Sequence, residues 1–93
     1  MGRVTFEVLV EVRLHSGIAD PQGATIERSL PTLGFAGVSG VRVGKAIRFR
    51  LEAPDEAAAR QRVEALCERF LTNPVLEGYE VSLGAPQAAE AAS

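Results

Sequence analysis

Residues 41–51 read VRVGKAIRFRL and occupy the middle of this 93-residue chain. Apolar and charged residues alternate on both sides of Gly44, a pattern typical of a β-hairpin that turns at Gly44-Lys45. A strand and a helix precede the hairpin, and a helix and a strand follow it. The order is therefore β-α-β-β-α-β, which predicts a single α+β domain with both helices on one face of an antiparallel sheet.

The register of this hairpin is open. A two-residue turn places Val41 and Val43 on the face opposite Ile47 and Phe49. Three solutions remain: a loop with an odd number of residues, a bulge that resets the alternation, or burial of both valines by another subunit.

Residues 4–14 predict the longest strand, because their side chains alternate between an apolar face and a mixed face. Residues 79–83 predict the last strand in the same way. Right-handed crossovers favour a four-stranded sheet in the ferredoxin-like order 4-1-3-2, with strands one and three central. In that order Glu7 and Glu11 lie beside Arg48 and Arg50 on the uncovered face, where opposite charges support the pairing.

Two acidic residues mark the starts of the predicted helices. Asp20 caps the first helix and Pro21 takes its first position, and Asp55 caps the second. Apolar residues at helical spacing predict one core stripe in each helix. The first stripe contains Ile26, Leu30 and Leu33, and the second contains Ala59, Val63, Leu66 and Phe70, with Cys67 and Leu71 beside it.

The end of the first helix has its own signals. Gly34 is the expected left-handed terminator, and Phe35 folds back toward Leu30 as in a Schellman ending. Pro31 removes one backbone hydrogen bond and is expected to bend the last turn.

Composition excludes several classes of protein. A hydrophobic fraction of 46% is typical of a globular domain, and a net charge of −2 argues against nucleic-acid binding. Apolar runs fall short of the roughly 20 residues that cross a bilayer, and the start of the chain is not expected to be a signal peptide. One cysteine fits a reducing, cytoplasmic setting. We expect a domain at residues 1–84 and a disordered tail at 85–93.

Candidates for chemistry are few. His15 is the single histidine, which excludes a His-based metal cluster, and it is expected to be a hydrogen-bonded surface residue. Cys67 is expected to be a buried structural thiol. Gly44-Lys45 lacks the rest of a phosphate-binding loop. Aromatic residues that could stack RNA bases are missing from the uncovered sheet face. We therefore expect no catalytic, cofactor-binding or metal-binding residue in this chain.

Five short motifs follow one another at a spacing that is similar to a known family. They are Asp20-Pro21-Gln22-Gly23, Leu33-Gly34-Phe35, residues 41–45, the helix that contains Cys67, and Asn73-Pro74-Val75 with Tyr79-Glu80-Val81. Together they resemble the PurS subunit of phosphoribosylformylglycinamidine synthase over about residues 3 to 83.

The resemblance implies a non-catalytic assembly subunit in de novo purine biosynthesis. A PurQ-type glutaminase subunit would release ammonia, and a PurL-type synthetase subunit would use ATP and Mg²⁺ to incorporate it. This chain would associate with itself, as a dimer or as a tetramer of two dimers, and bridge the two larger subunits so that ammonia passes between them. It would bind no cofactor itself.

Partner contacts are expected at caps and turns, although cap and turn geometry alone also explains these residue types. The candidates are Asp20, Gln22, Gly23, Arg42, Gly44, Lys45, Asn73 and Pro74. The alternative function is a small ligand-binding regulatory domain of the ACT-like type, because other folds of this element order bind amino acids between paired subunits. A small phosphatase of similar topology would need a basic residue on the first loop, where His15 is the only candidate.

Overall fold

The computed structural model describes residues 3–88. Its elements follow the order β-α-β-α-β-β, with short helical turns after each helix. They are β1 (Val4–Leu14), α1 (Pro21–Ser29), a 3-10 turn (Pro31–Leu33), β2 (Lys45–Ala53), α2 (Glu56–Leu66), a π-helical turn (Cys67–Leu71), β3 (Glu77–Leu83) and β4 (Gln87–Ala88).

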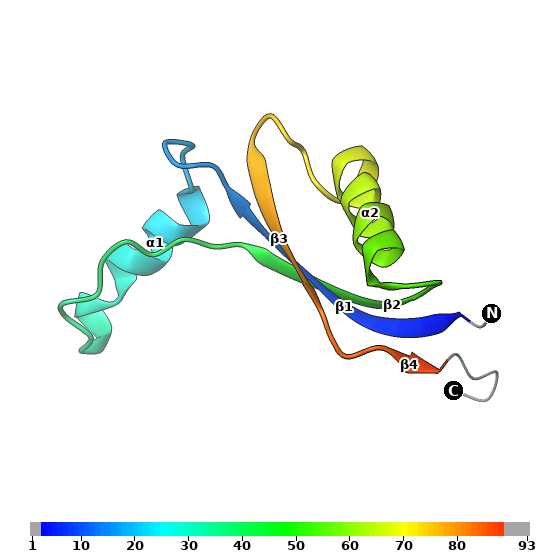
Figure 1. Cartoon of the computed structure of the whole chain (residues 1–93). Helices are drawn as coiled ribbons and strands as arrows, with labels where there is room; N and C mark the ends of the chain where they lie inside the picture. Colours follow the sequence, from blue (N-terminus) through cyan, green and yellow to red (C-terminus); the bar gives the residue numbers. More distant parts are fainter. Residues whose placement is uncertain (1–2, 89–93) are drawn as a thin grey trace.

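Strand β1 is the long strand that its regular alternation predicts, and it is the centre of the sheet. It pairs antiparallel with β2 along one edge and with β3 along the other. Phe6, Val8, Val10 and Val12 point to one face and are almost fully buried, at 0–3% exposure. We call this the helix face, because α2 packs on it (Figure 1). The alternate residues of β1 form the open face.

The predicted four-stranded sheet in the order 4-1-3-2 is wrong. Three long antiparallel strands form the sheet in the order β2-β1-β3, so that only β1 is central, and the fourth strand is the two-residue β4. The two residues of β4 pair with Val4 and Thr5, on the edge of β1 that β3 has left. Between them, the Gly84 N–H donates to the Glu7 carbonyl at 2.8 Å. Thus β4 continues the line of β3 within the segment expected as a tail, and residues 89–93 lie outside the described residues.

The predicted hairpin at Gly44 is also absent from the described chain. Residues 41–44 are not a strand, although their apolar residues alternate, and β2 begins only at Lys45. The backbone amides of Val41 and Val43 instead donate to the carboxylates of Glu27 and Asp20. Residues 41–44 therefore return beside helix α1, and the register problem of a two-residue turn does not arise.

The pairing of charged residues on the open face is confirmed for one pair. Glu7 lies opposite Arg50, and the Arg50 Nε is 2.7 Å from the Glu7 Oε2. Arg48 instead lies opposite Leu9, and Glu11 lies opposite Ala46. Both members of the Glu7–Arg50 pair are more than half exposed, so the pair contributes little to stability.

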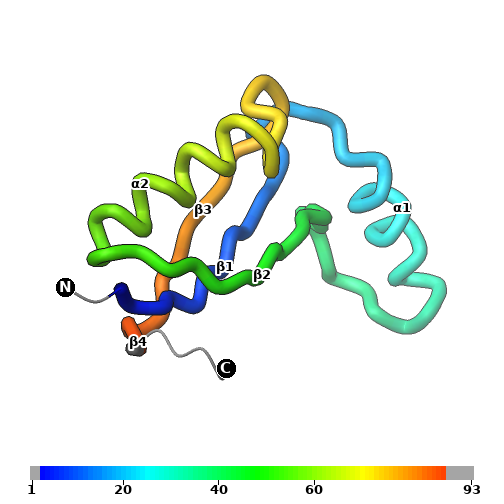
Figure 2. Tube along the Cα trace, turned by 90° about the vertical axis from the view of Figure 1, so that its right-hand side faces the viewer, coloured from blue at the N-terminus to red at the C-terminus, as the bar shows by residue number. Residues whose placement is uncertain are grey.

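Only one of the two helices covers the sheet, which is the third correction to the predicted fold. Helix α1 leaves the end of β1 and lies beyond the sheet, whereas α2 lies along the helix face (Figures 1 and 2). We call residues 20–44 the arm. Within α1 only Gly23 is buried, and Ile26 and Leu33 of the predicted core stripe are 44% and 67% exposed.

The predicted ends of α1 are confirmed. Asp20 accepts the Gly23 N–H at 2.9 Å and Pro21 follows as the first helical residue. The α-helix stops at Ser29, Pro31 opens a 3-10 turn, and Gly34 closes it in the left-handed conformation at φ 95°. The Phe35 N–H donates to the Leu30 carbonyl at 2.9 Å, the long hydrogen bond of a Schellman ending.

Helix α2 has the predicted cap but a different core stripe. The Asp55 carboxylate accepts the Ala58 N–H at 2.8 Å. Ala59, Val63 and Cys67 are buried at four-residue spacing, whereas Leu66 is 39% and Phe70 is 79% exposed. The chain widens into a π-helical turn at Cys67, which rotates the residues after it around the helix axis.

The chain is elongated because the arm projects from the sheet. Its radius of gyration is 17.7 Å and its extents are 58 × 29 × 17 Å. A compact domain of this length has a radius of gyration of about 12 Å. The core is correspondingly confined to the contact between α2 and the sheet.

Candidate functional site

Asp20 links the start of the arm to the segment by which the arm returns, at the point where the arm leaves the sheet. Its Oδ1 accepts the Gly23 N–H at 2.9 Å, and its Oδ2 accepts the Val43 N–H at 2.7 Å. These hydrogen bonds, that from Gly23 first, lower the pKa of Asp20 below its ordinary value because they favour the charged form. Both carboxylate oxygens are therefore engaged in holding backbone.

Two glycines allow the backbone to approach closely at the same place. A Cβ on Gly23 would lie 2.3 Å from the Val41 carbonyl oxygen, and a Cβ on Gly44 would lie 2.6 Å from the Val12 carbonyl oxygen. Both distances are shorter than any ordinary contact with a Cβ. The early glycine in α1, which weakens a helix, is thus required by the return of the chain beside it.

Arg42 binds the end of the arm to the loop that precedes the arm. Its Nη1 donates to the Ile18 carbonyl at 3.2 Å and its Nη2 donates to the His15 carbonyl at 3.3 Å. One residue earlier, the Val41 N–H donates to the Glu27 Oε1 at 3.0 Å. The return segment is therefore held by side chains at three successive residues, 41–43.

The loop that contains Asn73 and Pro74 reaches the same end of the sheet through His15. The His15 Nε2 lies 3.0 Å from the Pro74 carbonyl oxygen, and the His15 N–H donates to the Leu76 carbonyl at 2.8 Å. Within the loop, the Asn73 Oδ1 accepts the Val75 N–H at 3.1 Å. His15 is thus the hydrogen-bonded surface residue that its place in the sequence predicts.

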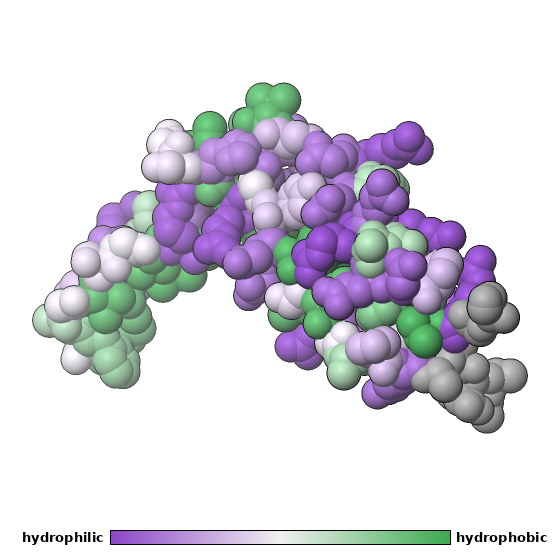
Figure 3. Space-filling view, viewed as in Figure 1, coloured by the Kyte–Doolittle hydropathy of each residue, from purple (hydrophilic) through white to green (hydrophobic). Residues whose placement is uncertain are grey.

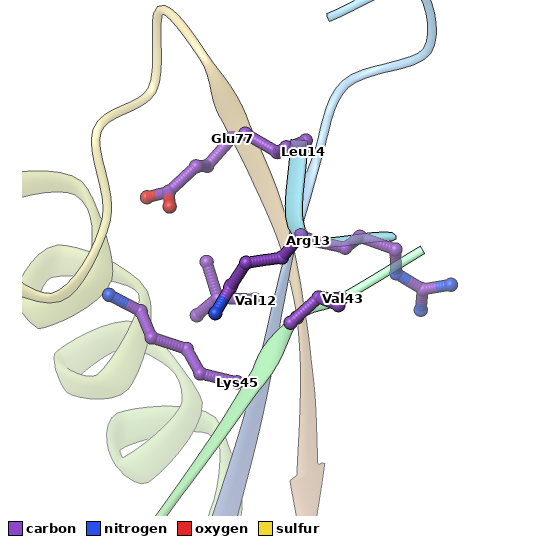
Figure 4. A pocket seen from close by; sticks show the side chains of 8 residues that line it. Val12, Arg13, Leu14, Val43, Lys45 and Glu77 are labelled. Atoms are coloured by element: carbon purple, nitrogen blue, oxygen red, sulfur yellow. The ribbon is translucent and has the colours of Figure 1, made fainter. Parts of the chain in front are cut away.

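A shallow hollow of about 200 Å³ opens between these segments on the helix face. Figure 4 shows the side chains of Lys45 and Glu77 on the side of the sheet where α2 lies, whereas Arg13 extends away from it. Arg13 instead pairs with Glu80 on the open face at 2.8 Å. The residues that line the hollow are Val12, Arg13, Leu14, Gln22, Val43, Gly44, Lys45 and Glu77.

The structure therefore brings the predicted contact residues to one end of the sheet. We call this region the junction; it consists of residues 15–23, 41–45 and 73–77. Asp20, Gly23 and Arg42 hold the backbone, and Gln22, Gly44 and Lys45 line the hollow. Asn73 and Pro74 join only through His15. Glu77 was not predicted, because its position depends on the pairing of β3 with Leu14.

Exposed apolar side chains form a second feature that the sequence did not predict. One group lies along the arm, and Figure 3 shows hydrophobic residues gathered there. The other lies near the end of α2 and in the following loop. The arm carries Ile26, Leu33, Phe35 and Val38, at 44–67% exposure, and the other group is Leu66, Phe70, Val75 and Leu76, at 39–80%. Exposed apolar groups of this kind mark interaction surfaces.

Two reactive groups lie on α2 and β3, away from the junction. Burial raises the pKa of the Cys67 thiol, which is fully buried and so behaves as a small apolar residue. Tyr79 donates its hydroxyl to the Glu68 Oε2 at 2.9 Å, and this bond raises the pKa of Tyr79 to about 12. Neither group is arranged as a nucleophile.

Among residues 3–88, no group of three or more His, Cys, Asp and Glu side chains could hold a metal ion. No helix in this part of the chain is long and apolar enough to cross a membrane.

A family model described as PurS, phosphoribosylformylglycinamidine (FGAM) synthase, matches residues 7–85. The PurS subunit of Synechocystis is 41% identical over 75 residues, which cover 81% of this chain and 75% of that protein. The subunit of Thermotoga maritima is 40% identical over 76 residues, covering 82% and 93%.

Solved structures of PurS subunits are similar to this chain in fold. The crystal structure of the Thermotoga maritima purS subunit has a TM-score of 0.83 at 36% identity and covers 90% of this chain and 97% of that one. A chain in the structure of PurLQS from the same organism has a TM-score of 0.80 at 38% identity, covering 86% and 98%.

Proposed function

The chain belongs to the PurS family of phosphoribosylformylglycinamidine synthase subunits, and we propose that it acts as the non-catalytic assembly subunit of that enzyme. In this role it joins a glutaminase subunit to an ATP-dependent synthetase subunit, so that ammonia released by one reaches the other. The reaction belongs to purine biosynthesis, the pathway of the enzyme that contains the PurS subunit of Methanocaldococcus jannaschii.

One observation carries the assembly role. A chain of the PurLQS structure aligns with 86% of this one, at a TM-score of 0.80 and with 98% of its own length covered. Relatives of this shape are therefore found in a complex with other subunits. The exposed apolar side chains on the arm and near Phe70 give this chain surfaces for such contacts.

The polar groups of the junction support a role without catalysis. Asp20 and Arg42 form hydrogen bonds to backbone atoms of the chain itself. Cys67 is buried and its raised pKa keeps it a thiol at neutral pH. A nucleophile or general base must instead be accessible and must have a pKa close to the pH of the reaction. In this proposal, the neighbouring subunits carry out glutamine hydrolysis and the ATP-dependent step.

We further propose that the chain self-associates around a two-fold axis and that the junction contacts a partner subunit. Closed two-fold pairing is the commonest arrangement of homo-oligomers, and a tetramer would pair two such dimers. The ACT-like alternative is tested by thermal-shift screening with amino acids, because a ligand that raises the melting temperature in the absence of the other subunits would support it.

Reconstitution tests the assembly role. The synthetase and glutaminase subunits are assayed with and without this chain, using glutamine or ammonium as the nitrogen donor. Omission should abolish most glutamine-dependent turnover and leave ammonium-dependent turnover in place. Undiminished glutamine-dependent turnover without this chain would exclude the bridging role.

A charge reversal at the junction tests the contact. Lys45→Glu should weaken assembly, because Lys45 lines the hollow and extends from the sheet (Figure 4). Arg48→Glu makes a matched reversal on the open face of the same strand and should leave assembly unchanged. Equal complex formation by the two variants would remove the junction from the contact surface.

A further inference from the structure

Strand β1 runs beyond its last partner in β2. The pairing of the two strands ends at Val12 and Lys45, whereas β1 itself continues to Leu14. The next residue, His15, donates its N–H toward the β3 side, to the Leu76 carbonyl. Successive residues of a strand direct their backbone groups to opposite edges. The N–H of Leu14 therefore faces the β2 side, where the described chain gives it no strand partner.

Two opposite charges flank the same end of β1 on the helix face. Lys45 lies opposite Val12 on one side, and Glu77 lies opposite Leu14 on the other. Both side chains extend to the side of the sheet on which α2 lies (Figure 4). Within residues 3–88 neither of them takes part in an ion pair. A cation and an anion thus line the same hollow without neutralising each other.

The hollow between these groups has the size of a small molecule. Its volume is about 200 Å³, below the range of roughly 300–1,000 Å³ for sites that bury drug-sized ligands. Val12, Leu14 and Val43 give it an apolar wall. A neutral solute would leave both charged side chains without a partner. The hollow instead matches a small molecule that carries an ammonium and a carboxylate close together.

We propose that the hollow binds a free α-amino acid as its zwitterion. The carboxylate of the ligand accepts from Lys45 and from the N–H of Leu14, both on the β2 side. The ammonium of the ligand donates to Glu77 on the β3 side. The Glu77 Oε1 also accepts the Asn73 N–H at 2.8 Å, which orients that carboxylate. The site lies within one chain, so the inference goes beyond the assembly role and does not depend on it.

The charges favour a free amino acid over a strand of another protein. An extended peptide that added to the edge of β1 at Leu14 would present only neutral backbone groups there. Lys45 and Glu77 would then lose contact with water without gaining a partner, which costs free energy.

Amide chemical shifts test the site with ligand analogues. The isotope-labelled full-length chain is titrated with alanine and with derivatives that lack the ammonium, the carboxylate or both: N-acetylalanine, alanine amide and N-acetylalanine amide. Alanine should shift the amides of Leu14, Gly44 and Lys45 in a saturable way. Each derivative should bind at least about tenfold more weakly, because a charge-assisted hydrogen bond is lost.

Substitutions supply the matched comparison. Lys45→Met and Glu77→Gln keep the length of each side chain and remove its charge, so each should weaken alanine binding about tenfold. Arg48→Met and Glu11→Gln make the same changes on the open face and should leave alanine binding unchanged. Circular dichroism checks that every variant keeps its helix content.

Other outcomes overturn the proposal. An absence of saturable shifts with alanine would reject the site. Equal binding of N-acetylalanine would show that only an anion is recognised, and tighter binding of N-acetylalanine amide would show that the edge of β1 takes a peptide strand. An alanine response that survives both Lys45→Met and Glu77→Gln would place the ligand elsewhere, such as between paired subunits in the ACT-like manner. The assembly role is decided separately, by reconstitution.

Discussion

The Oδ2 of Asp20 accepts the backbone N–H of Val43 at 2.7 Å, although the two residues are 23 positions apart. The other oxygen of the same carboxylate caps helix α1 through Gly23. One side chain therefore starts the helix and holds the returning chain against it. The direction in which the arm leaves the sheet depends on this bond.

The two roles of Asp20 can be separated by substitution. Asp20→Asn keeps an oxygen for the helix cap but offers an N–H to the N–H of Val43. We expect the Val43 amide to exchange with solvent roughly tenfold faster or more, with little change in α1. Asp20→Ala should release both. Asp55→Ala removes the matching cap of α2 and should leave the exchange of Val43 unchanged.

The same bonds predict how the arm responds to acid. The pKa of Asp20 is lowered in the folded chain, first by the hydrogen bond from Gly23 and then by that from Val43. Its contribution to stability is therefore complete above the ordinary pKa of 3.8 and is lost as the pH falls through the lowered value. Protection of the Val43 amide should persist at pH 4 and disappear on further acidification. Loss of protection already between pH 6 and 5 would contradict this assignment.

Gly44 should tolerate no side chain. Gly44→Ala places a Cβ 2.6 Å from the Val12 carbonyl oxygen, so the backbone must move. We expect a loss of about 1–3 kcal/mol in the free energy of unfolding, measured in urea. Gly84→Ala is the control, because its nearest neighbour, the Glu7 Cβ, is 3.4 Å away. Similar losses for both variants would show that close approach at Val12 is not the cause.

Tyr79 offers a spectroscopic test because it is the only tyrosine. Its phenol donates to Glu68, whose bond raises the pKa of Tyr79 to about 12. The stability gained from this bond is complete below the ordinary value of 10.0 and is lost as the pH rises through 12. In ultraviolet titration, Glu68→Gln should move ionisation back toward 10.0. Glu64→Gln should shift it little, because Glu64 makes the smallest contribution.

Local signals in the sequence predicted the local structure well. The alternation of residues 4–14, the caps Asp20 and Asp55 and the terminator Gly34 all hold, because each depends on neighbours within a few residues. The placement of α1 away from the sheet could not be predicted from such local signals. Its apolar stripe shows that the helix packs on something, but periodicity does not say on which surface, or whether that surface belongs to the same chain.

Two further errors have the same physical origin. Val41 and Val43 alternate with charged residues as in a strand, but their amides find carboxylates of Asp20 and Glu27 instead of a neighbouring strand. The predicted stripe of α2 assumed regular helical geometry to its end, and the π-helical turn exposes Phe70. In both cases the apolar pattern is present in the sequence, but the groups that these residues contact cannot be read from neighbouring residues. The candidate contact residues of the junction could be named from the sequence because caps and turns are local signals, and their contact with a partner stays a prediction.

Strands β1 and β2 are paired as far as Val12 and Lys45, so residues 13–44 are topologically the loop of one very long β-hairpin. Closing a longer loop costs little extra entropy, because the cost rises only with the logarithm of its length. The sheet with α2 is consequently a self-contained unit into which the arm is inserted. Excising the arm and joining the two strands by a tight turn would leave a compact miniature domain that lacks the exposed apolar side chains of the arm.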